Sequence, residues 1–186
     1  LFPSTRPAWQ LKTAWTSAMD DVLRRLDALK TGEPLGLELD AVEKGIAHRR
    51  RLFGFAAQDR GFAEQQGWHR ARTATVERLH LAAAHLSPAE AGRAGAGALN
   101  ALRCLCAAFK EDLAEGRPFR LDAEAVKALE PAKALPAPLR EMADALQCMA
   151  EAETRPFPPQ EARREALFAA DALSNPNHLK FAVRTV

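Results

Sequence analysis

The sequence predicts an all-α protein, and three features of its composition and spacing carry that prediction. Alanine, the residue with the highest helix propensity, makes up about a fifth of the chain. Ile occurs once, Tyr never and Val six times, so the β-branched and aromatic residues that build sheets are scarce. Nearly all of the 12 prolines fall between segments whose apolar residues recur at helical spacing, which indicates that the prolines separate helices.

Length and charge narrow the class further. A chain of 186 residues, 47% of them hydrophobic, suffices for one domain with a buried core. The formal net charge of +2 gives no general attraction to nucleic acid, so we expect no nucleic-acid partner. No run approaches the roughly 18 apolar residues that span a bilayer. We therefore expect an antiparallel helical bundle of six to seven helices in a single domain, with residues 1–173 forming a soluble bundle.

The first predicted helix runs from about residue 7 to Lys30. It is followed by three residues that break helices, Gly32, Pro34 and Gly36. Its apolar residues recur at steps of three and four, which places them on one face of a helix. They are Leu11, Trp15, Met19, Val22, Leu26 and Leu29.

The second predicted helix covers about residues 39–60, and its apolar face is interrupted. Arg49 and Arg50 stand at the step where a further apolar residue is expected. A buried charge needs a partner or a bound anion, so this interruption raises the question of what these arginines face. The apolar face consists of Leu39, Val42, Ile46, Phe53 and Ala57.

A capping box separates the third and fourth predicted helices. The third covers about residues 68–86, and the segment Ser87-Pro88-Ala89-Glu90 then starts a fourth that ends near Glu115. In such a box the Ser hydroxyl and the Glu carboxylate each accept a hydrogen bond from the other residue's backbone N–H. Three glycines near the start of the fourth helix each cost about 1 kcal/mol of helix propensity, so we expect them to permit close helix contact. They are Gly92, Gly95 and Gly97.

The remaining helices are separated by glycine and proline. Gly116 and Pro118 end the fourth helix, and a short helix over residues 122–130 follows. The next helix is predicted by apolar residues at steps of three, four and three. They are Leu139, Met142, Leu146 and Met149. A last full helix covers residues 160–173, and Asn175-Pro176 starts another.

No set of residues predicts catalysis or a bound metal. The five histidines match no zinc-binding spacing, and the chain has no nucleophile–base pair, phosphate loop or redox motif. Glu77 and His80 share a helix face as in a di-iron ligand pair, but no second Glu-x-x-His accompanies them. We therefore expect no enzyme activity, no cofactor and no metal. The cysteines are expected to be free buried thiols, with two of them on different faces of one helix. They are Cys104, Cys106 and Cys148.

The densest basic cluster, Arg49-Arg50-Arg51, has two interpretations. It can be a solvated helix face with one arginine laying its stem along the edge of the core. Alternatively, Arg49 and Arg50 form an anion site, because a guanidinium matches the geometry of a carboxylate. If the charge is buried, either an acidic side chain of another helix pairs with it, or the cluster faces a groove that admits carboxylate-bearing molecules.

The end of the chain carries a segment that resembles a known family. Its pattern is Asn-Pro-x-His-x-x-Phe-Ala-x-(Arg/Lys)-Thr, which is found in the fusaric acid resistance and aromatic carboxylic acid efflux protein family. In that family the segment lies just before the second block of transmembrane helices, and a helical soluble region of about this length lies between the blocks. The opening Leu1-Phe2-Pro3 looks like the exit from the first block. The matching residues are Asn175, Pro176, His178, Phe181, Ala182, Arg184 and Thr185.

The resemblance implies a domain of an inner-membrane exporter of aromatic or other organic acids. Residues 174–186 would then be the juxtamembrane start of a helix that leads into a transmembrane block absent from this chain. The implied partners are the protein's own transmembrane blocks, a periplasmic adaptor and an outer-membrane channel. A homo-oligomer is a further alternative. The domain would couple the blocks, mediate assembly or gate access of the substrate.

Charge at the two ends indicates the side of the membrane. No acidic residue occurs before Asp20 or after Asp171, and basic residues lie near both ends. Positive flanks of transmembrane helices favour the cytoplasmic face, so we expect the domain to lie on the cytoplasmic side of the inner membrane. The alternative is a free-standing helical module for protein interaction or ligand sensing. If both ends enter one bilayer, they should emerge on the same side of the bundle.

Overall fold

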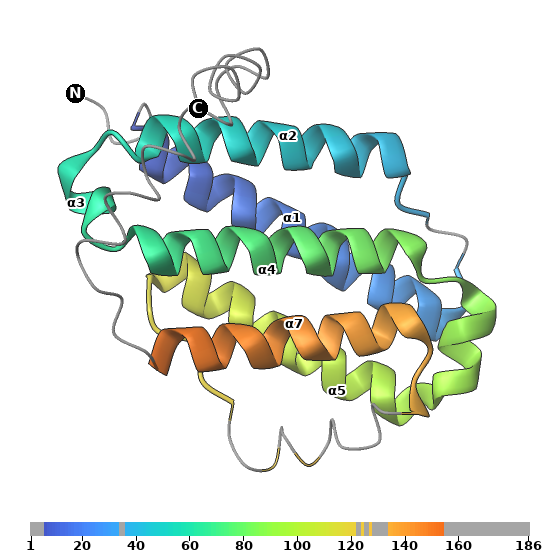
Figure 1. Ribbon diagram of the computed structural model, residues 1–186. Coiled ribbons are helices and arrows are strands. Elements are labelled where there is room, and N and C mark those ends of the chain that lie inside the picture. The colour runs from blue at the N-terminus through green and yellow to red at the C-terminus, as the bar shows by residue number, and fades with distance from the viewer. Residues whose placement is uncertain (1–5, 34–35, 122–123, 125–126, 128–133, 155–186) are drawn as a thin grey trace, which may run out of the picture.

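The computed structural model describes residues 6–33, 36–121, 124, 127 and 134–154 (Figure 1). Within these ranges the protein has six helices and no strand. The helices are α1 (Pro7–Thr31), α2 (Leu39–Ala56), α3 (Arg60–Ala63), α4 (Gln66–His85), α5 (Pro88–Glu115) and α7 (Ala137–Thr154). The prediction of an all-α helical bundle in a single domain is confirmed.

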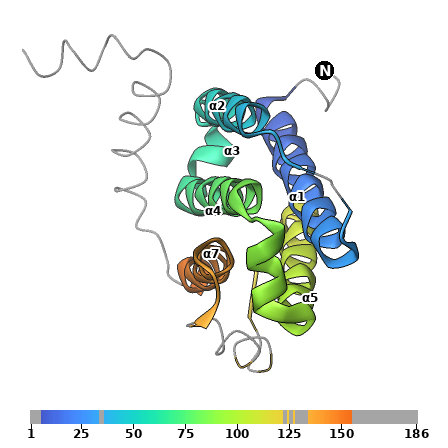
Figure 2. The same cartoon turned by 90° about the vertical axis from the view of Figure 1, so that its right-hand side faces the viewer.

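Helices α1 and α4 form the middle of the bundle. α1 packs against α2, α4 and α5, whereas α4 packs against α1, α2 and α7. Figure 2 shows α2 above the pair formed by α1 and α4, with α5 below α1 and α7 below α4. α5 also contacts α7, so the core is enclosed on its lower side as well. The arrangement leaves α2 on the side of the bundle opposite to α5 and α7.

Most neighbouring helices run in opposite directions, as predicted. In Figure 1, α1 and α4 run from left to right, whereas α2, α5 and α7 run from right to left. α1 is therefore antiparallel to α2 and α5, and α4 is antiparallel to α2 and α7, but α5 and α7 are parallel. The start of α1 and the end of α7 lie at the same end of the bundle (Figure 1).

The apolar stripes predicted from spacing form the core. In α1, every stripe residue except Leu29 is at most 3% exposed. The four predicted stripe residues of α7 are also buried, and Leu29 is half-buried against the same core. The largest fully buried side chains come from all the long helices except α2, together with Leu86 and Phe119 just outside helices. They are Phe109, Phe119, Leu11, Met19, Leu26, Leu79, Leu86, Leu102, Leu113, Leu139, Met142 and Leu146.

α2 ends earlier than predicted, and its first residue is not in the core. The helix stops at Ala56, and a hydrogen-bonded turn leads into α3. This turn brings Phe62 into the core, where it packs edge-to-face on Phe53 with ring centroids 5.5 Å apart. The prediction of one helix to residue 60 was therefore wrong, because burial of Phe62 requires the chain to change direction. Leu39, predicted to be buried, is 40% exposed.

The capping box between α4 and α5 is confirmed. The Glu90 N–H donates to Ser87 Oγ at 3.3 Å, and the Ser87 N–H donates to Glu90 Oε2 at 3.0 Å. The Ser87 hydroxyl also donates to Glu90 Oε2 at 2.7 Å, and this bond, together with the one from the Ser87 N–H, stabilises the charged carboxylate and lowers the pKa of Glu90. Arg25 of α1 donates from Nη2 to the Leu86 carbonyl at 2.7 Å, so the same junction is also anchored to the middle of the bundle.

The three glycines near the start of α5 do not serve close helix contact. A Cβ atom added at Gly92, Gly95 or Gly97 would meet no atom within 4 Å. That expectation was therefore wrong. Gly95 instead has φ 82° and ψ 158°, a conformation that only glycine adopts readily, and it kinks the helix at this point. Its role is conformational: it redirects α5 after its first two turns.

A buried ion pair joins α4, α7 and the segment after α5. Arg72 and Glu153 are 2.6 Å apart, with side chains 9% and 3% exposed. Arg72 also donates from Nη2 to the Arg117 carbonyl at 3.0 Å, and Glu153 Oε2 accepts the Phe119 N–H. Three segments distant in the sequence therefore meet at one pair of charges. Sequence spacing did not reveal this pair, because its members are 81 residues apart.

The cysteines are free, but only one of them is buried. Cys106 is fully buried and burial raises the pKa of its thiol to about 12, whereas Cys104 and Cys148 are exposed. The prediction that Cys104 and Cys106 face different sides is confirmed, and the prediction that all three thiols are buried was wrong.

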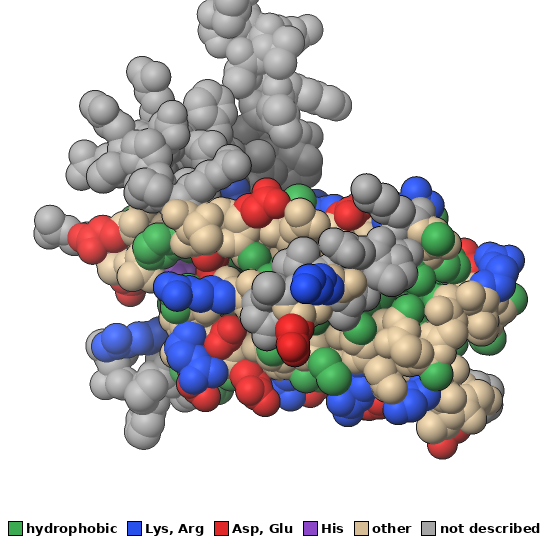
Figure 3. All heavy atoms as spheres, turned by 90° about the horizontal axis from the view of Figure 1, so that it is seen from below, with side chains coloured by type: hydrophobic (Ala, Val, Ile, Leu, Met, Phe, Trp, Pro, Cys, Tyr) green, Lys and Arg blue, Asp and Glu red, His purple; other side chains and the backbone are tan. Residues whose placement is uncertain are grey.

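The face seen in Figure 3 carries acidic and basic side chains interspersed with apolar ones.

Several predicted features fall on residues 155–186, outside the part that the structure describes. These are the helix over residues 160–173, the boundary at 173/174 and the family segment from Asn175 to Thr185. Most of the short helix predicted over residues 122–130 also lies outside the described residues. Among the described helices, none combines the length and apolarity required to cross a bilayer.

Replacing Glu153 by Ala should destabilise the protein strongly. The substitution leaves the Arg72 guanidinium buried without its acid, which typically costs about 3–5 kcal/mol in free energy of unfolding. The matched control is Glu141→Ala, since Glu141 pairs with Arg78 at 2.6 Å with both side chains more than a third exposed. That control should cost less than about 1 kcal/mol. Urea unfolding measures both values, and equal losses would contradict the central role of the buried pair.

Replacing Gly95 by Ala should destabilise α5, whereas the same change at Gly97 should not. An alanine at φ 82° carries strain of about 1–3 kcal/mol. Gly97 is exposed and helical, so alanine there should raise the free energy of unfolding by up to about 1 kcal/mol. Thermal unfolding followed by circular dichroism compares the two variants. A stabilised Gly95→Ala variant would show that the kink is not required by the fold.

Candidate anion-binding groove

A groove of about 400 Å³ lies between α1, α2 and α4. We call it the Arg49 groove. α1 supplies most of its wall, α2 supplies the opposite wall, and His80 of α4 lies at its floor. The lining residues are Trp9, Gln10, Thr13, Ala14, Ser17, Ala18, Asp21, Ala41, Gly45, His48, Arg49 and His80. The helical repeat explains the grouping, since positions three and four apart share a helix face.

Arg49 is the most deeply buried charge in the groove wall, with 3% of its surface exposed. Its Nη2 lies 3.3 Å from Nδ1 of His80, and its Nε has no hydrogen-bond partner. Desolvation lowers the pKa of Arg49, although Glu77 and Asp21 partly oppose this effect. No ion pair involves Arg49 among the described residues. Its charge is therefore offset only at a distance.

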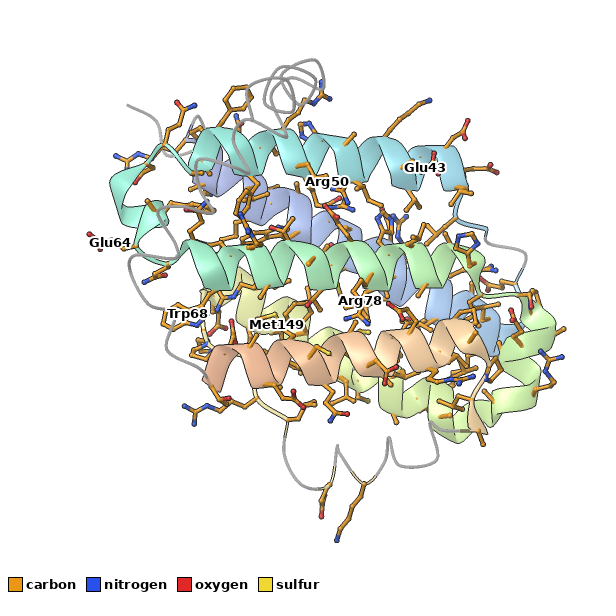
Figure 4. The ribbon with its side chains drawn as sticks, viewed as in Figure 1. Glu43, Arg50, Glu64, Trp68, Arg78 and Met149 are labelled. Carbon is orange, nitrogen blue, oxygen red and sulfur yellow. The ribbon has the colours of Figure 1, made fainter. Side chains whose placement is uncertain are left out.

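Arg50 has a different environment from its neighbour. It donates from Nε and Nη2 to both carboxylate oxygens of Glu77, the shortest contact being 2.8 Å. Its side chain is 54% exposed, and the hydrogen bonds to Glu77 raise its pKa. Figure 4 shows Arg50 between α2 and α4. Arg50 therefore has an acid of another helix as its partner, whereas Arg49 lines the groove and has no ion pair among the described residues.

His80 links Arg49 to Asp21. Burial and the Arg49 charge lower the pKa of His80 to about 4, so the imidazole is neutral near pH 7. An arginine only donates, so Nδ1 accepts from Arg49 and the ring proton is placed on Nε2. That nitrogen lies 3.6 Å from Asp21 Oδ2 and makes no hydrogen bond. The imidazole therefore fixes the position of the guanidinium without neutralising it.

The acids around the groove already have their own basic partners. Asp21 pairs with Arg24, and Glu77 pairs with Arg50. Each of these two pairs has no net charge, so the Arg49 guanidinium leaves one net positive charge around the groove. Chemically, the arrangement is suited to holding a single negative charge against the Arg49 guanidinium.

Gly45 gives the groove access to that guanidinium. A Cβ atom at position 45 would lie 3.2 Å from Arg49 Nη1, which is a tighter contact than most Cβ atoms make, and 4.0 Å from His80 Cε1, which is an ordinary distance. Glycine therefore leaves the side of the guanidinium open. Neither Gly45 nor His80 was assigned to this site from the sequence: Gly45 precedes Arg49 by one helical turn, a spacing that was not considered, and His80 is brought beside α2 only by the fold.

A second cavity, of about 460 Å³, lies at the start of α1. His69 lies in its wall and stacks on Phe62 with ring centroids 4.0 Å apart, and on Trp15 with centroids 5.9 Å apart. Burial lowers the pKa of His69 to about 4, with the charge of Arg72 acting in the same direction. Its Nδ1 has no hydrogen-bond partner. The aromatic stack shows that His69 packs against two core side chains, which no sequence pattern had indicated.

Glu77 and His80, which share a helix face, are each placed against an arginine rather than against each other. Glu77 contacts Arg50 and His80 contacts Arg49. Within the described residues no group of three His, Cys, Asp or Glu side chains is placed to hold a metal ion. The chemistry available around these residues is therefore that of guanidinium groups.

The comparisons with known proteins identify no relatives. No protein-family model, no curated protein and no solved structure matches the chain.

Acidification should destabilise the protein between about pH 6.5 and pH 4. His69 and His80 have folded-state pKa values of about 4, below the ordinary value of 6.5, so in this range the unfolded chain binds protons that the folded chain does not. The free energy of unfolding should fall as the pH decreases, by on the order of 3 kcal/mol per histidine across the window. Urea unfolding of the wild type, His69→Gln and His80→Gln at several pH values measures this slope. An unchanged slope in both variants would contradict the assignment.

Proposed function

We propose that the chain is the cytoplasmic helical domain of an inner-membrane efflux transporter that exports aromatic or other organic acids. The observation that carries the proposal is the segment from Asn175 to Thr185, which resembles the juxtamembrane segment of the fusaric acid resistance family. In this proposal the domain is not an enzyme. Its role is to couple the two membrane blocks, to mediate assembly or to gate access of the substrate.

Two further observations support the proposal. The start of α1 and the end of α7 lie at the same end of the bundle, which is compatible with a domain inserted between two membrane blocks, although the two chain ends themselves lie outside the described residues (Figure 1). The first 19 residues and the last 15 contain no acidic residue, and basic residues lie in both stretches. Basic flanks of transmembrane helices favour the cytoplasmic side. A periplasmic adaptor and an outer-membrane channel are the partners that such a transporter would use.

The Arg49 groove favours a second candidate function, that of a free-standing ligand-sensing module. A concave site with one buried cation fits a small anionic ligand whether or not a membrane is nearby. The two candidates differ in where the natural polypeptide resides. They agree in having no catalytic step.

Fractionation of cells that produce the natural protein should place it in the inner membrane. An antibody raised against this chain should detect it in membranes after alkaline extraction, and protease should reach the epitope in inverted vesicles but not in intact spheroplasts. Deleting the gene should increase sensitivity to aromatic carboxylic acids. The measurements are immunoblots of each fraction and growth inhibition by the acids.

The outcome separates the two candidates. Recovery of the natural polypeptide entirely in the soluble fraction would overturn the transporter proposal and leave the sensing module. Protection of the epitope in inverted vesicles would overturn the cytoplasmic placement. A tightly bound inner-membrane protein with unchanged acid sensitivity would overturn the proposed substrate class.

A further inference from the structure

We propose that the Arg49 groove is a binding site for a small organic monocarboxylate, held by the Arg49 guanidinium and selected against anions with two or more charges. The inference goes beyond the proposed function, since it concerns the described residues alone and holds in solution without a membrane.

Arg49 has hydrogen-bonding capacity that the described residues do not use. The side chain is 3% exposed, and among the described residues its only hydrogen-bond partner is the neutral ring of His80, with Nε left unsatisfied. A buried guanidinium ordinarily has an acid beside it, because leaving its charge uncompensated is costly. Arg50, one residue away, illustrates the ordinary case with its bidentate bond to Glu77. A carboxylate is the ligand that matches the planar guanidinium.

Charge selectivity follows from the neighbouring acids. Asp21 lies in the groove wall beside His80, and Glu77 contributes negative potential at Arg49. One negative charge on a ligand balances Arg49, whereas a second would face these carboxylates without a cation of its own, since Arg24 and Arg50 are already paired. The groove should therefore prefer a monocarboxylate to phosphate or a dicarboxylate.

The uncharged part of the ligand would contact apolar side chains. Trp9, which is 47% exposed, and three alanines line the groove next to the polar groups. These side chains offer apolar surface to a ring or short chain attached to the carboxylate. The volume of about 400 Å³ lies in the range of sites for small molecules. The three alanines are Ala14, Ala18 and Ala41.

The experiment measures binding of benzoate to the 186-residue chain by calorimetry and by amide NMR. Phosphate, phthalate and the neutral amide benzamide serve as comparison ligands. We expect saturable binding of benzoate at millimolar concentration or below, with shifts at Gly45 and at the Trp9 indole. The neutral amide and the two multiply charged anions should bind at least about tenfold more weakly, the difference expected for one charge-assisted hydrogen bond.

Variants on α2 locate the site. Arg49→Gln should weaken benzoate binding by about tenfold or more, whereas Arg51→Gln, which changes an exposed arginine two residues away, should alter it by less than about twofold. Gly45→Ala retains the charge but crowds Nη1, so it should weaken binding. Circular dichroism and thermal unfolding establish that each variant is folded. Arg49→Gln should fold, because it removes a desolvated charge.

Several outcomes would overturn the proposal. The first is the absence of saturable benzoate binding to the wild type up to tens of millimolar. Others are undiminished binding in Arg49→Gln, an equal loss in Arg51→Gln, or preference for phosphate or phthalate. None of these results depends on cellular location, so the failure of this proposal is distinguishable from the failure of the transporter proposal.

Discussion

Two buried hydrogen bonds fix the position of α1 against α4, and the rest of the molecule is arranged around that pair. Near the start of α1, Trp15 Nε1 donates to Thr73 Oγ1 at 3.2 Å, and near its end Arg25 Nη2 donates to the Leu86 carbonyl at 2.7 Å. Apolar packing alone tolerates sliding of one helix along another, whereas two buried polar contacts ten residues apart on α1 require one register. That register places Asp21 opposite His80 between the two bonds.

The groove follows from this register. α2 lies across α1 and α4, and its Arg49 extends to the His80 ring that the register has placed. The other face of the α1–α4 pair is covered by α5 and α7, where Arg72 and Glu153 join the segments. The bundle thus carries apolar packing throughout, with buried charges confined to a few positions where helices from different parts of the chain meet. At those positions the polar contacts fix the register between helices, which apolar packing alone does not fix.

The sequence predicted the helices well because their signals are local. The stripe of α1, the capping box at Ser87 and the stripe of α7 each depend on residues within one or two turns of one another. The end of α2 and the kink at Gly95 were not predicted. The first depends on Phe62 packing against Phe53, and the second on a glycine conformation, and neither produces a periodic pattern. Long-range packing decided the first case, and the backbone conformation of a single glycine decided the second.

For the candidate site, the sequence indicated that two arginines interrupt the apolar face of α2, but it did not indicate which residues of other helices surround them. The missing apolar step at Arg49 and Arg50 marked two arginines that a core-facing helix would not normally carry, and one of them is indeed buried. Which arginine pairs with an acid depends on the position of α4, 27 to 31 residues further along the chain. His80 and Asp21 entered the site for the same reason. A one-dimensional pattern contains no information on such contacts.

Comparison of the three buried arginines shows why Arg49 differs from the others. Arg72 bonds to a carboxylate and a carbonyl, and Arg25 bonds to the carbonyl that ends α4, so each of them connects segments of the fold. Arg49 is the most deeply buried of the three, yet its hydrogen-bond partner is an uncharged imidazole. A structural arginine offsets its desolvation through bonds that stabilise the folded chain. Arg49 lies at a groove, and among the described residues its bond is to a neutral ring, which is why we propose a ligand as the partner of its charge.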